Sequence, residues 1–333
     1  MIDATQALPA SRAPRRRGLL RARGIDPSIL FGAGFFAALL VANLATNAGT
    51  FAPDNIGPTV GLAAPVVLAA LAVTPTLLVG NGGIDLSVGP VMGLVNVLVV
   101  YELIGQAGID GAVPGIAVAL GAGLAAGLVN GVLVAYLRIQ PIVATLGTYL
   151  IAAGLTLALL STPGGTTPGW LDTLSGGASV IPILVVLAAW ALFVSRPVYE
   201  RLMATGGDER AAFTSGIDTT AVRIVAYAVG GLIAGVAGIA LSAVLGSADP
   251  TVGPSYTLTG IAAAALGGVS LAGGRGGMLR ALVGALTIFL LQNLLTYLHT
   301  SPFLLQVAYG AVLVAAVAIN GQADALLRRL RRA

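Results

Sequence analysis

An acidic side chain and a hydroxyl stand close together in one short glycine-rich segment. The segment GGIDLSVG, at 82–89, places Asp85 and Ser87 between two long apolar stretches. An ionisable residue near membrane depth is costly and is by default a candidate functional group. A carboxylate at a helix start can instead accept hydrogen bonds from free backbone N–H groups. We favour this capping role for Asp85 and keep a role in solute passage as the alternative.

Uncharged polar residues also occur inside the apolar stretches. Each of them can hydrogen-bond a neighbouring helix, and for any single one this packing role is favoured. As a set they fit a path for a polyhydroxylated or otherwise polar, neutral solute. The predicted solute pathway comprises Asp85, Ser87, Asn96, Asn130, Thr145, Gln292 and Asn293.

The residues needed for catalysis or metal binding are scarce. The chain has no Cys and a single His, His299, which argues against thiol chemistry, disulfides and Cys- or His-ligated metals. No charge cluster suggests an ion pathway, and Asp85 is the one candidate for ion coupling. We therefore predict no catalytic residue, no metal site and no cofactor bound by this chain. An ion-coupled secondary transporter and a membrane-embedded enzyme are the weaker alternatives.

The composition indicates that lipid surrounds these residues. The 333 residues are 57% hydrophobic and 9% charged, and the mean hydropathy is +0.95. Soluble domains carry about 25% charged residues. The 46 glycines agree, because glycine lets membrane helices approach closely. The net charge of +4 does not indicate nucleic acid, since the arginines lie between apolar stretches rather than in one patch.

Apolar stretches of membrane-spanning length predict about ten transmembrane helices. The third and eighth are candidates for broken or re-entrant helices buried in protein. The predicted spans are 28–47, 56–79, 88–103, 112–136, 141–161, 179–195, 223–246, 256–273, 279–298 and 303–321.

The basic residues predict the orientation. With the N-terminus in the cytoplasm, all 17 basic residues, every one an Arg, fall in cytoplasmic segments. The outer loops then hold acidic residues and no basic one. This pattern follows the positive-inside rule and places both termini in the cytoplasm. The predicted layout is a basic tail at 1–27, one transmembrane domain at 28–322 and a basic tail at 323–333.

The loop at 196–222 is the longest charged connection between predicted spans. Gly206 and Gly207 interrupt it, Asp208 can cap a short helix, and Gly216 can end that helix. Loops of this length are more often functional than simple connectors. We therefore predict a partner-docking surface on the cytoplasmic side.

Two glycine-rich segments share the frame GGxxLxxG. GGIDLSVG at 82–89 has its counterpart in GGVSLAGG at 267–274. Internal duplication is common in transporters. The match hints at an imperfect repeat.

Longer motifs resemble the permease subunits of ribose-type ABC importers, in a family that also includes branched-chain amino-acid and nucleoside permeases. The resemblance covers roughly 55–320, and GGIDLSVG is its most specific piece. The other matching stretches are GLVNGVLVAYLRIQPIVATLGTYLIAAGL at 127–155, ATGGDERAAFTSGID at 204–218, YAVGGLIAGVAGIALSA at 227–243 and IAAAALGGVSLAGGRGG at 261–277.

The resemblance implies an ATP-driven importer of a sugar or similar polar solute in the bacterial cytoplasmic membrane. It implies ABC ATPase subunits that hold ATP and Mg²⁺, a second permease subunit in a homo- or heterodimer, and an extracytoplasmic binding protein. The segment 204–216 would hold the coupling helix, where GGDERAA replaces the commoner GGNEEAA. The coupling residues are expected to be Glu200, Arg201, Gly206, Gly207, Asp208, Glu209, Arg210 and Gly216.

Overall fold

The computed structural model describes residues 27–301, 303–316 and 318. Within these residues the chain is helical and contains no β-strand. One isolated antiparallel bridge joins Gly164 and Ala248. The predicted all-α class is confirmed, and the predicted tails at 1–27 and 323–333 fall almost wholly outside the described residues.

Seven helices in the described part of the chain are long and apolar enough to cross a membrane. The π-helical segments Val97–Gln106 and Val132–Tyr136 extend α3 and α4. The seven are α2 (Pro53–Val79), α3 with its extension (Val88–Gln106), α4 with its extension (Ala112–Tyr136), α5 (Pro141–Leu159), α7 with the preceding turn (Gly177–Val194), α10 (Thr219–Leu245) and α12 (Met278–Tyr297).

Three shorter apolar helices overlap the remaining predicted spans. They are the Leu30–Thr46 part of α1 (Pro27–Thr46), α11 (Ser255–Leu266) and an unlabelled helix at Phe303–Ala316. Small helices fill the connections: η1 (Ala48–Phe51), α6 (Gly169–Asp172), η4 (Thr173–Ser175), η5 (Gly177–Ser179), α8 (Pro197–Gly207) and α9 (Glu209–Thr214).

The eighth predicted span, 256–273, is wrong in length. Helix α11 ends at Leu266, and its C-cap is Gly267. A Cβ atom at Gly267 would lie 1.8 Å from the carbonyl oxygen of Arg280, so this glycine lets the loop press against α12. Gly268, Gly273 and Gly274 then have positive φ angles, which end helical geometry. The glycines that suggested a repeat therefore break the helix.

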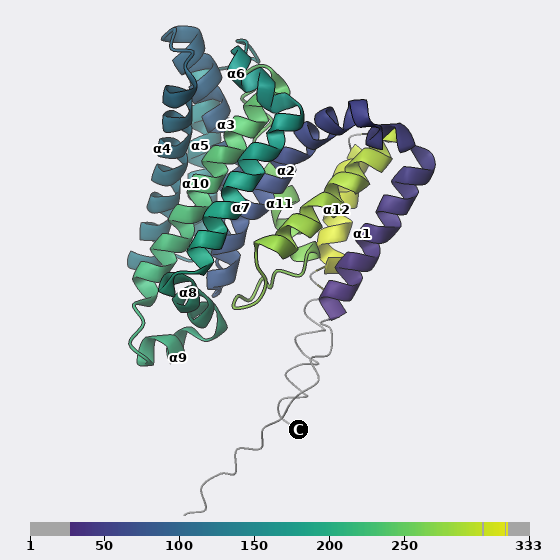
Figure 1. Cartoon of the computed structure of the whole chain (residues 1–333). Helices are drawn as coiled ribbons and strands as arrows, with labels where there is room; N and C mark the ends of the chain where they lie inside the picture. The colour runs from purple at the N-terminus through teal and green to yellow at the C-terminus, as the bar shows by residue number, and fades with distance from the viewer. Residues whose placement is uncertain (1–26, 302, 317, 319–333) are drawn as a thin grey trace, which may run out of the picture.

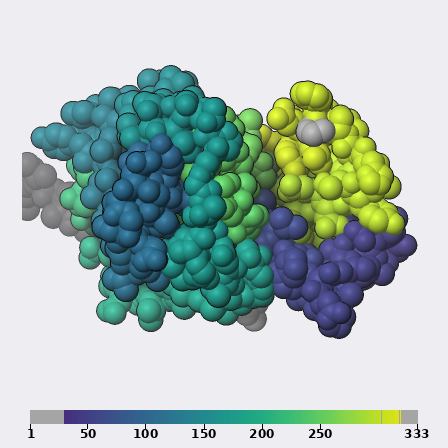
Figure 2. Space-filling view, turned by 90° about the horizontal axis from the view of Figure 1, so that it is seen from above, coloured from purple at the N-terminus to yellow at the C-terminus, as the bar shows by residue number. Residues whose placement is uncertain are grey.

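The helices form two neighbouring groups (Figure 1). Helices α3 to α7 and α10 stand side by side, and α1, α12 and the C-terminal helix lie to one side, beyond α2 and α11. From above, the purple and yellow ends of the chain form a lobe beside the teal and green bulk (Figure 2). Helices α8 and α9 lie together at one end of the bundle, which we call the α8–α9 end.

Helix α2 is the centre of the core, and α10 packs against it. Almost all of the apolar window of α2 is buried inside the protein. Helix α10 also packs against α4 through a glycine seam. A Cβ at Gly123 would lie 2.2 Å from the carbonyl oxygen of Gly231, and one at Gly127 would lie 2.4 Å from that of Tyr227. Close backbone approach through glycine is the usual way for membrane helices to associate.

Candidate functional site

Asp85 lies in the segment that joins α2 to α3, and it is 2% exposed. One carboxylate oxygen accepts hydrogen bonds from the backbone N–H of Ser87 at 2.9 Å and from the Ser87 hydroxyl at 2.7 Å. The Asn130 amide lies 3.4 Å from the same oxygen and donates to the Ser87 hydroxyl oxygen at 2.8 Å. Three predicted pathway residues therefore form one buried cluster.

The cluster ties the α2–α3 segment to α4 and α5. The Thr148 hydroxyl of α5 donates to Asn130 Oδ1 at 2.7 Å. The Thr145 hydroxyl, one turn earlier, lies 3.2 Å from the Ile84 carbonyl oxygen and 2.9 Å from the Pro141 carbonyl oxygen. Four of the seven predicted residues are thus brought together, and each uses its polar groups on the protein itself.

The prediction that Asp85 caps the third helix is wrong. Helix α3 begins at Val88, its N-cap is Ser87, and no side chain caps its free N–H groups. The Asp85 carboxylate accepts from the N–H of the N-cap residue Ser87 and not from an N–H of the helix itself, because it forms a local turn with Ser87. Burial raises the pKa of the Asp85 carboxyl, and the hydrogen bonds from Ser87 and Asn130 oppose this.

Asn96 lies in a different place and has its own partners. Its Nδ2 donates to the Ser242 hydroxyl and to the Ser247 carbonyl, both at 3.0 Å. Its Oδ1 accepts from the backbone N–H of Asp249 at 2.8 Å. The fully buried Asn96 therefore fastens α3 to the end of α10 and to the turn that follows it.

Gln292 and Asn293 lie together on α12, away from both of these clusters. They line a cavity of about 850 Å³ with residues of α2, α11 and the helix Phe303–Ala316. Asn293 Oδ1 is buried and has no hydrogen-bond partner within the described residues. These two residues are the part of the predicted pathway that faces open space.

The predicted docking loop folds into α8 and α9. Asp208 caps α9 by accepting from the Ala211 N–H at 3.0 Å, and Asp218 caps α10 by accepting from the Ala221 N–H at 3.0 Å. Gly216 follows α9 with φ of 84°. The capping and helix-ending roles inferred for Asp208 and Gly216 are therefore confirmed, and helix α8 runs as far as Gly207.

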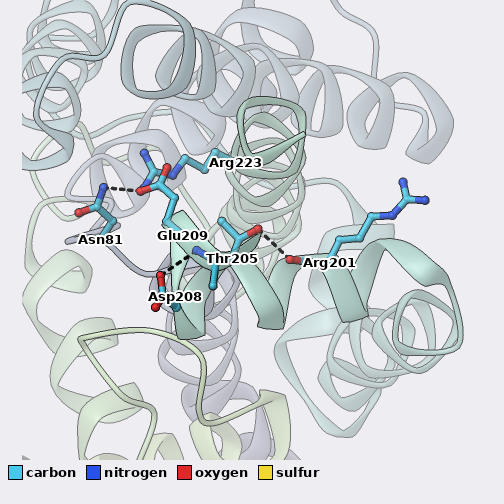
Figure 3. A network of polar contacts seen from close by, with 7 residues as sticks. Asn81, Arg201, Thr205, Asp208, Glu209 and Arg223 are labelled. Atoms are coloured by element: carbon cyan, nitrogen blue, oxygen red, sulfur yellow. Dashed lines mark hydrogen bonds and ion pairs between the residues drawn. The ribbon is translucent and has the colours of Figure 1, made fainter. Parts of the chain in front are cut away.

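A small polar network holds α9 against the bundle (Figure 3). Glu209 Oε2 accepts from Arg223 Nη2 at 2.8 Å and from Asn81 Nδ2 at 2.9 Å. On α8, the Thr205 hydroxyl donates to the Arg201 carbonyl at 2.8 Å. In contrast, Arg210 and Phe213 are exposed beside this network, and the Phe213 side chain is 69% exposed.

Backbone contacts between glycines join the docking loop to both glycine-rich segments. A Cβ at Gly206 would lie 1.9 Å from the Leu78 carbonyl oxygen and 2.6 Å from the Gly274 nitrogen. The Gly274 N–H donates to that Leu78 carbonyl at 3.0 Å. A Cβ at Gly273 would lie 2.3 Å from the Gly80 Cα. We call this meeting point of Leu78, Gly80, Gly206, Gly273 and Gly274 the glycine joint.

Sequence reasoning missed several of these partners. It did not select Gly80, Gly274, Thr148, Arg223 or Asn81 as site residues. The GGxxLxxG frame was the available signal for the glycine joint, because paired glycines allow backbones to touch. Asn130 beside Asp85, and Asn81 and Arg223 beside Glu209, come from other segments, and no spacing rule connects them.

The chain matches a known protein family over most of its length. Residues 55–317 match the family described as branched-chain amino acid transport system / permease component. The chain belongs to this permease family. The permease is a multi-pass protein of the inner membrane, and the predicted resemblance is confirmed.

Individual relatives are similar over most of their length. The ribose import permease protein RbsC of Bacillus subtilis (strain 168) is 36% identical over 305 residues, covering 88% of the permease and 92% of the relative. The D-allose transport system permease protein AlsC of Escherichia coli (strain K12) is 30% identical over 309 residues, covering 87% and 91%. The autoinducer 2 import system permease protein LsrC of Escherichia coli (strain K12 / DH10B) is 37% identical over 279 residues, covering 80% of each chain. No solved structure matches the permease significantly.

Proposed function

We propose that the permease is the transmembrane subunit of an ATP-driven importer for a sugar or a similar polar solute. The observation that carries this proposal is the similarity to ribose and allose permeases over nearly the whole chain. The described residues that line the α12 cavity are all uncharged, which supports a neutral solute. A branched-chain amino acid is the alternative cargo, because the family description names that class.

The proposed topology has ten membrane segments and both termini in the cytoplasm. Seven long helices and three shorter apolar helices of the described chain supply the segments. Arg138, Arg210 and Arg223 line one groove with α9, and Arg196 and Arg201 flank or lie on α8. Because arginines favour the cytoplasmic side, the α8–α9 end is assigned to the cytoplasm. Residues 28–322 form one transmembrane domain, with basic tails at either end.

The proposed docking surface for an ATPase subunit is the α8–α9 hairpin. Its outward groups, Arg210 and Phe213, make the contact, and Asp208 and Gly216 set the bounds of α9. Glu209 instead holds the hairpin to the bundle through Arg223. Gly206 passes movement of the hairpin to α2 and α11 through the glycine joint. Glu200, Arg201 and Gly207 complete the proposed coupling residues.

The remaining parts of the importer lie outside this chain. ATP and Mg²⁺ bind the partner ATPase, a second permease subunit completes the pore, and an extracytoplasmic binding protein delivers the solute. The described residues hold no group of three or more His, Cys, Asp or Glu side chains that could bind a metal. We propose that the permease, like the permease subunits to which it is similar, acts as a transport subunit without its own catalytic site.

Co-purification and reconstitution test the proposed function. The permease is purified gently from its native membrane, and the co-purifying soluble proteins are identified. The complex is then placed in vesicles with the binding protein and tested for uptake of D-ribose, D-allose and leucine. We expect uptake of a sugar that stops when the partner's ATPase is disabled. Uptake that persists without ATP hydrolysis would contradict the proposal.

A further inference from the structure

The cavity beside α12 has a lining that suits an uncharged, hydroxyl-rich solute. Its 850 Å³ lies within the usual size of ligand pockets. No charged side chain contributes to the lining. The polar lining residues are Thr251, Ser255, Tyr256, Thr259, Gln292, Asn293, Thr296, Gln306 and Tyr309.

The amide groups in this cavity have hydrogen-bonding capacity to spare. Asn293 Oδ1 is buried without a partner, and Gln292 and Gln306 make no hydrogen bond within the described residues. By contrast, the Asn96 and Asn130 amides bond the protein through both their nitrogen and their oxygen. Asn43 bonds it through its nitrogen, and its Oδ1 has no partner within the described residues. Unpaired polar groups are costly in an apolar membrane environment unless water or a solute satisfies them. Asn293 Oδ1 therefore favours a polar occupant of the cavity, and the half-buried Gln292 and the exposed Gln306 are open to the same occupant.

Apolar and aromatic groups complete the lining. Phe289, Tyr256 and Tyr309 also line the cavity. A sugar presents hydroxyl groups at its edge and C–H groups on its faces. Amides can pair with the hydroxyls in both directions, and aromatic rings can cover the C–H faces.

The cavity is lined in part by helices that the glycine joint connects to α8. Its lining comes from α2, α10, α11, α12 and the C-terminal helix. The glycine joint connects α8 directly to the end of α2 and to the loop between α11 and α12. A shift of that loop would move α11 and α12, which both line the cavity.

We propose that this cavity is a solute chamber in which Gln292, Asn293 and Gln306 hydrogen-bond an uncharged sugar or polyol during transport. The proposal rests on the function proposed above. It assigns solute contact to the α12 face and removes it from the Asp85 cluster, whose polar groups already bond one another. The three amides are then specificity-determining residues of the permease.

The chain lacks cysteine, so single cysteines can report on the chamber without background. Gln292→Cys and Thr296→Cys place a thiol in the cavity lining. Thr287→Cys, on the same helix, is the matched control, because Thr287 is fully buried and does not line the cavity. Each variant is assembled with its ATPase and binding protein in vesicles and treated with a charged, water-soluble thiol reagent.

We expect the reagent to modify Gln292→Cys and Thr296→Cys at least tenfold faster than Thr287→Cys. D-Ribose or D-allose should slow modification of the two cavity variants at least threefold. Absence of modification would show that lipid or protein fills the cavity and would overturn the proposal. Modification that neither sugar slows would also overturn it.

A transport measurement separates this inference from the proposed function. Gln292→Leu and Gln306→Leu should raise KM at least fivefold for the transported sugar and change its rate relative to a second sugar. ATP-dependent uptake by the wild-type complex with unchanged KM in both variants would leave the proposed function standing and refute the chamber. Failure of the wild-type complex to take up any sugar would refute the proposed function itself.

Discussion

Glu209 and Arg223 form an ion pair at 2.8 Å that closes α9 onto the start of α10. The Arg223 side chain is 12% exposed and that of Glu209 is 33% exposed, so the pair is partly shielded from water. Asn81 donates to the same Glu209 oxygen. Glu209 therefore serves the internal structure of the α8–α9 hairpin, although its place in the sequence suggested direct contact with an ATPase.

Exchanging the two charged residues should restore the ion pair. Glu209→Arg alone places two positive groups together and should destabilise the hairpin by about 1 kcal/mol or more. The double variant Glu209→Arg, Arg223→Glu should regain most of that loss. Thermal unfolding of the purified permease gives the coupling energy through a double-mutant cycle. Strictly additive effects would mean that the pair contributes nothing.

Arg210 should act on partner binding rather than on folding. Its side chain is exposed beside Phe213 at the outer side of α9. Arg210→Glu should weaken association with the ATPase roughly tenfold, which corresponds to about 1.4 kcal/mol. Arg210→Lys, which keeps the charge, is the control. Equal co-purification of both variants with the ATPase would remove Arg210 from the docking surface.

The two neighbouring glycines at the end of α8 should respond very differently to alanine. A Cβ at Gly206 would lie 1.9 Å from the Leu78 carbonyl oxygen, whereas a Cβ at Gly207 meets nothing within 4 Å. Gly206→Ala should therefore force the glycine joint apart and cost about 2 kcal/mol.

Gly207→Ala is the matched control for the glycine joint and should retain wild-type thermal stability. We also expect Gly206→Ala to reduce solute uptake more than basal ATP hydrolysis by the assembled complex, because the joint links α8 to α2 and α11. If both alanine variants behave alike, the close backbone contact does not constrain the protein.

Asp85 should tolerate an amide but not an apolar group. Asp85→Asn keeps the Oδ1 acceptor for Ser87 and Asn130 and should retain half or more of wild-type uptake. Asp85→Leu leaves buried donors without a partner, at about 1–3 kcal/mol for each group. Uptake and membrane insertion are measured together. Loss of uptake in a normally inserted Asp85→Asn variant would show that the carboxyl group itself functions in transport.

Burial also gives the Asp85 cluster a pH dependence with a definite sign. Because the folded protein raises the pKa of this carboxyl, the protonated form is favoured on folding. The contribution to stability is present below the ordinary value of 3.8 and is lost as pH rises through the raised folded pKa. Asp85→Asn should therefore gain stability relative to wild type as pH rises. If the stability difference between Asp85→Asn and wild type stays the same across that pH range, the pKa of the carboxyl does not change on unfolding.

The sequence by itself determined the class of the protein, most of its apolar helices and the bounds of α9. Apolar length, a helix cap such as Asp208 and a terminating glycine such as Gly216 act within a few residues, so local rules suffice. Those rules did not predict that α8 runs through Gly206 and Gly207. The sequence also selected Asp85, Asn130 and Gln292 from residue type alone. It overextended α11, because hydropathy does not register the backbone contacts that require Gly267 and Gly274.

Only the tertiary structure decided which polar residues are already paired and which face open space. Asn130 and Gln292 are both amides within apolar helices, and nothing local distinguishes them. Asn130 finds Ser87 and Thr148 on neighbouring segments, whereas Gln292 faces a cavity lined by five helices. Hydrogen-bond partners separated by many residues depend on how the helices pack, and that packing also brings Gly206 onto Leu78 and Glu209 onto Arg223.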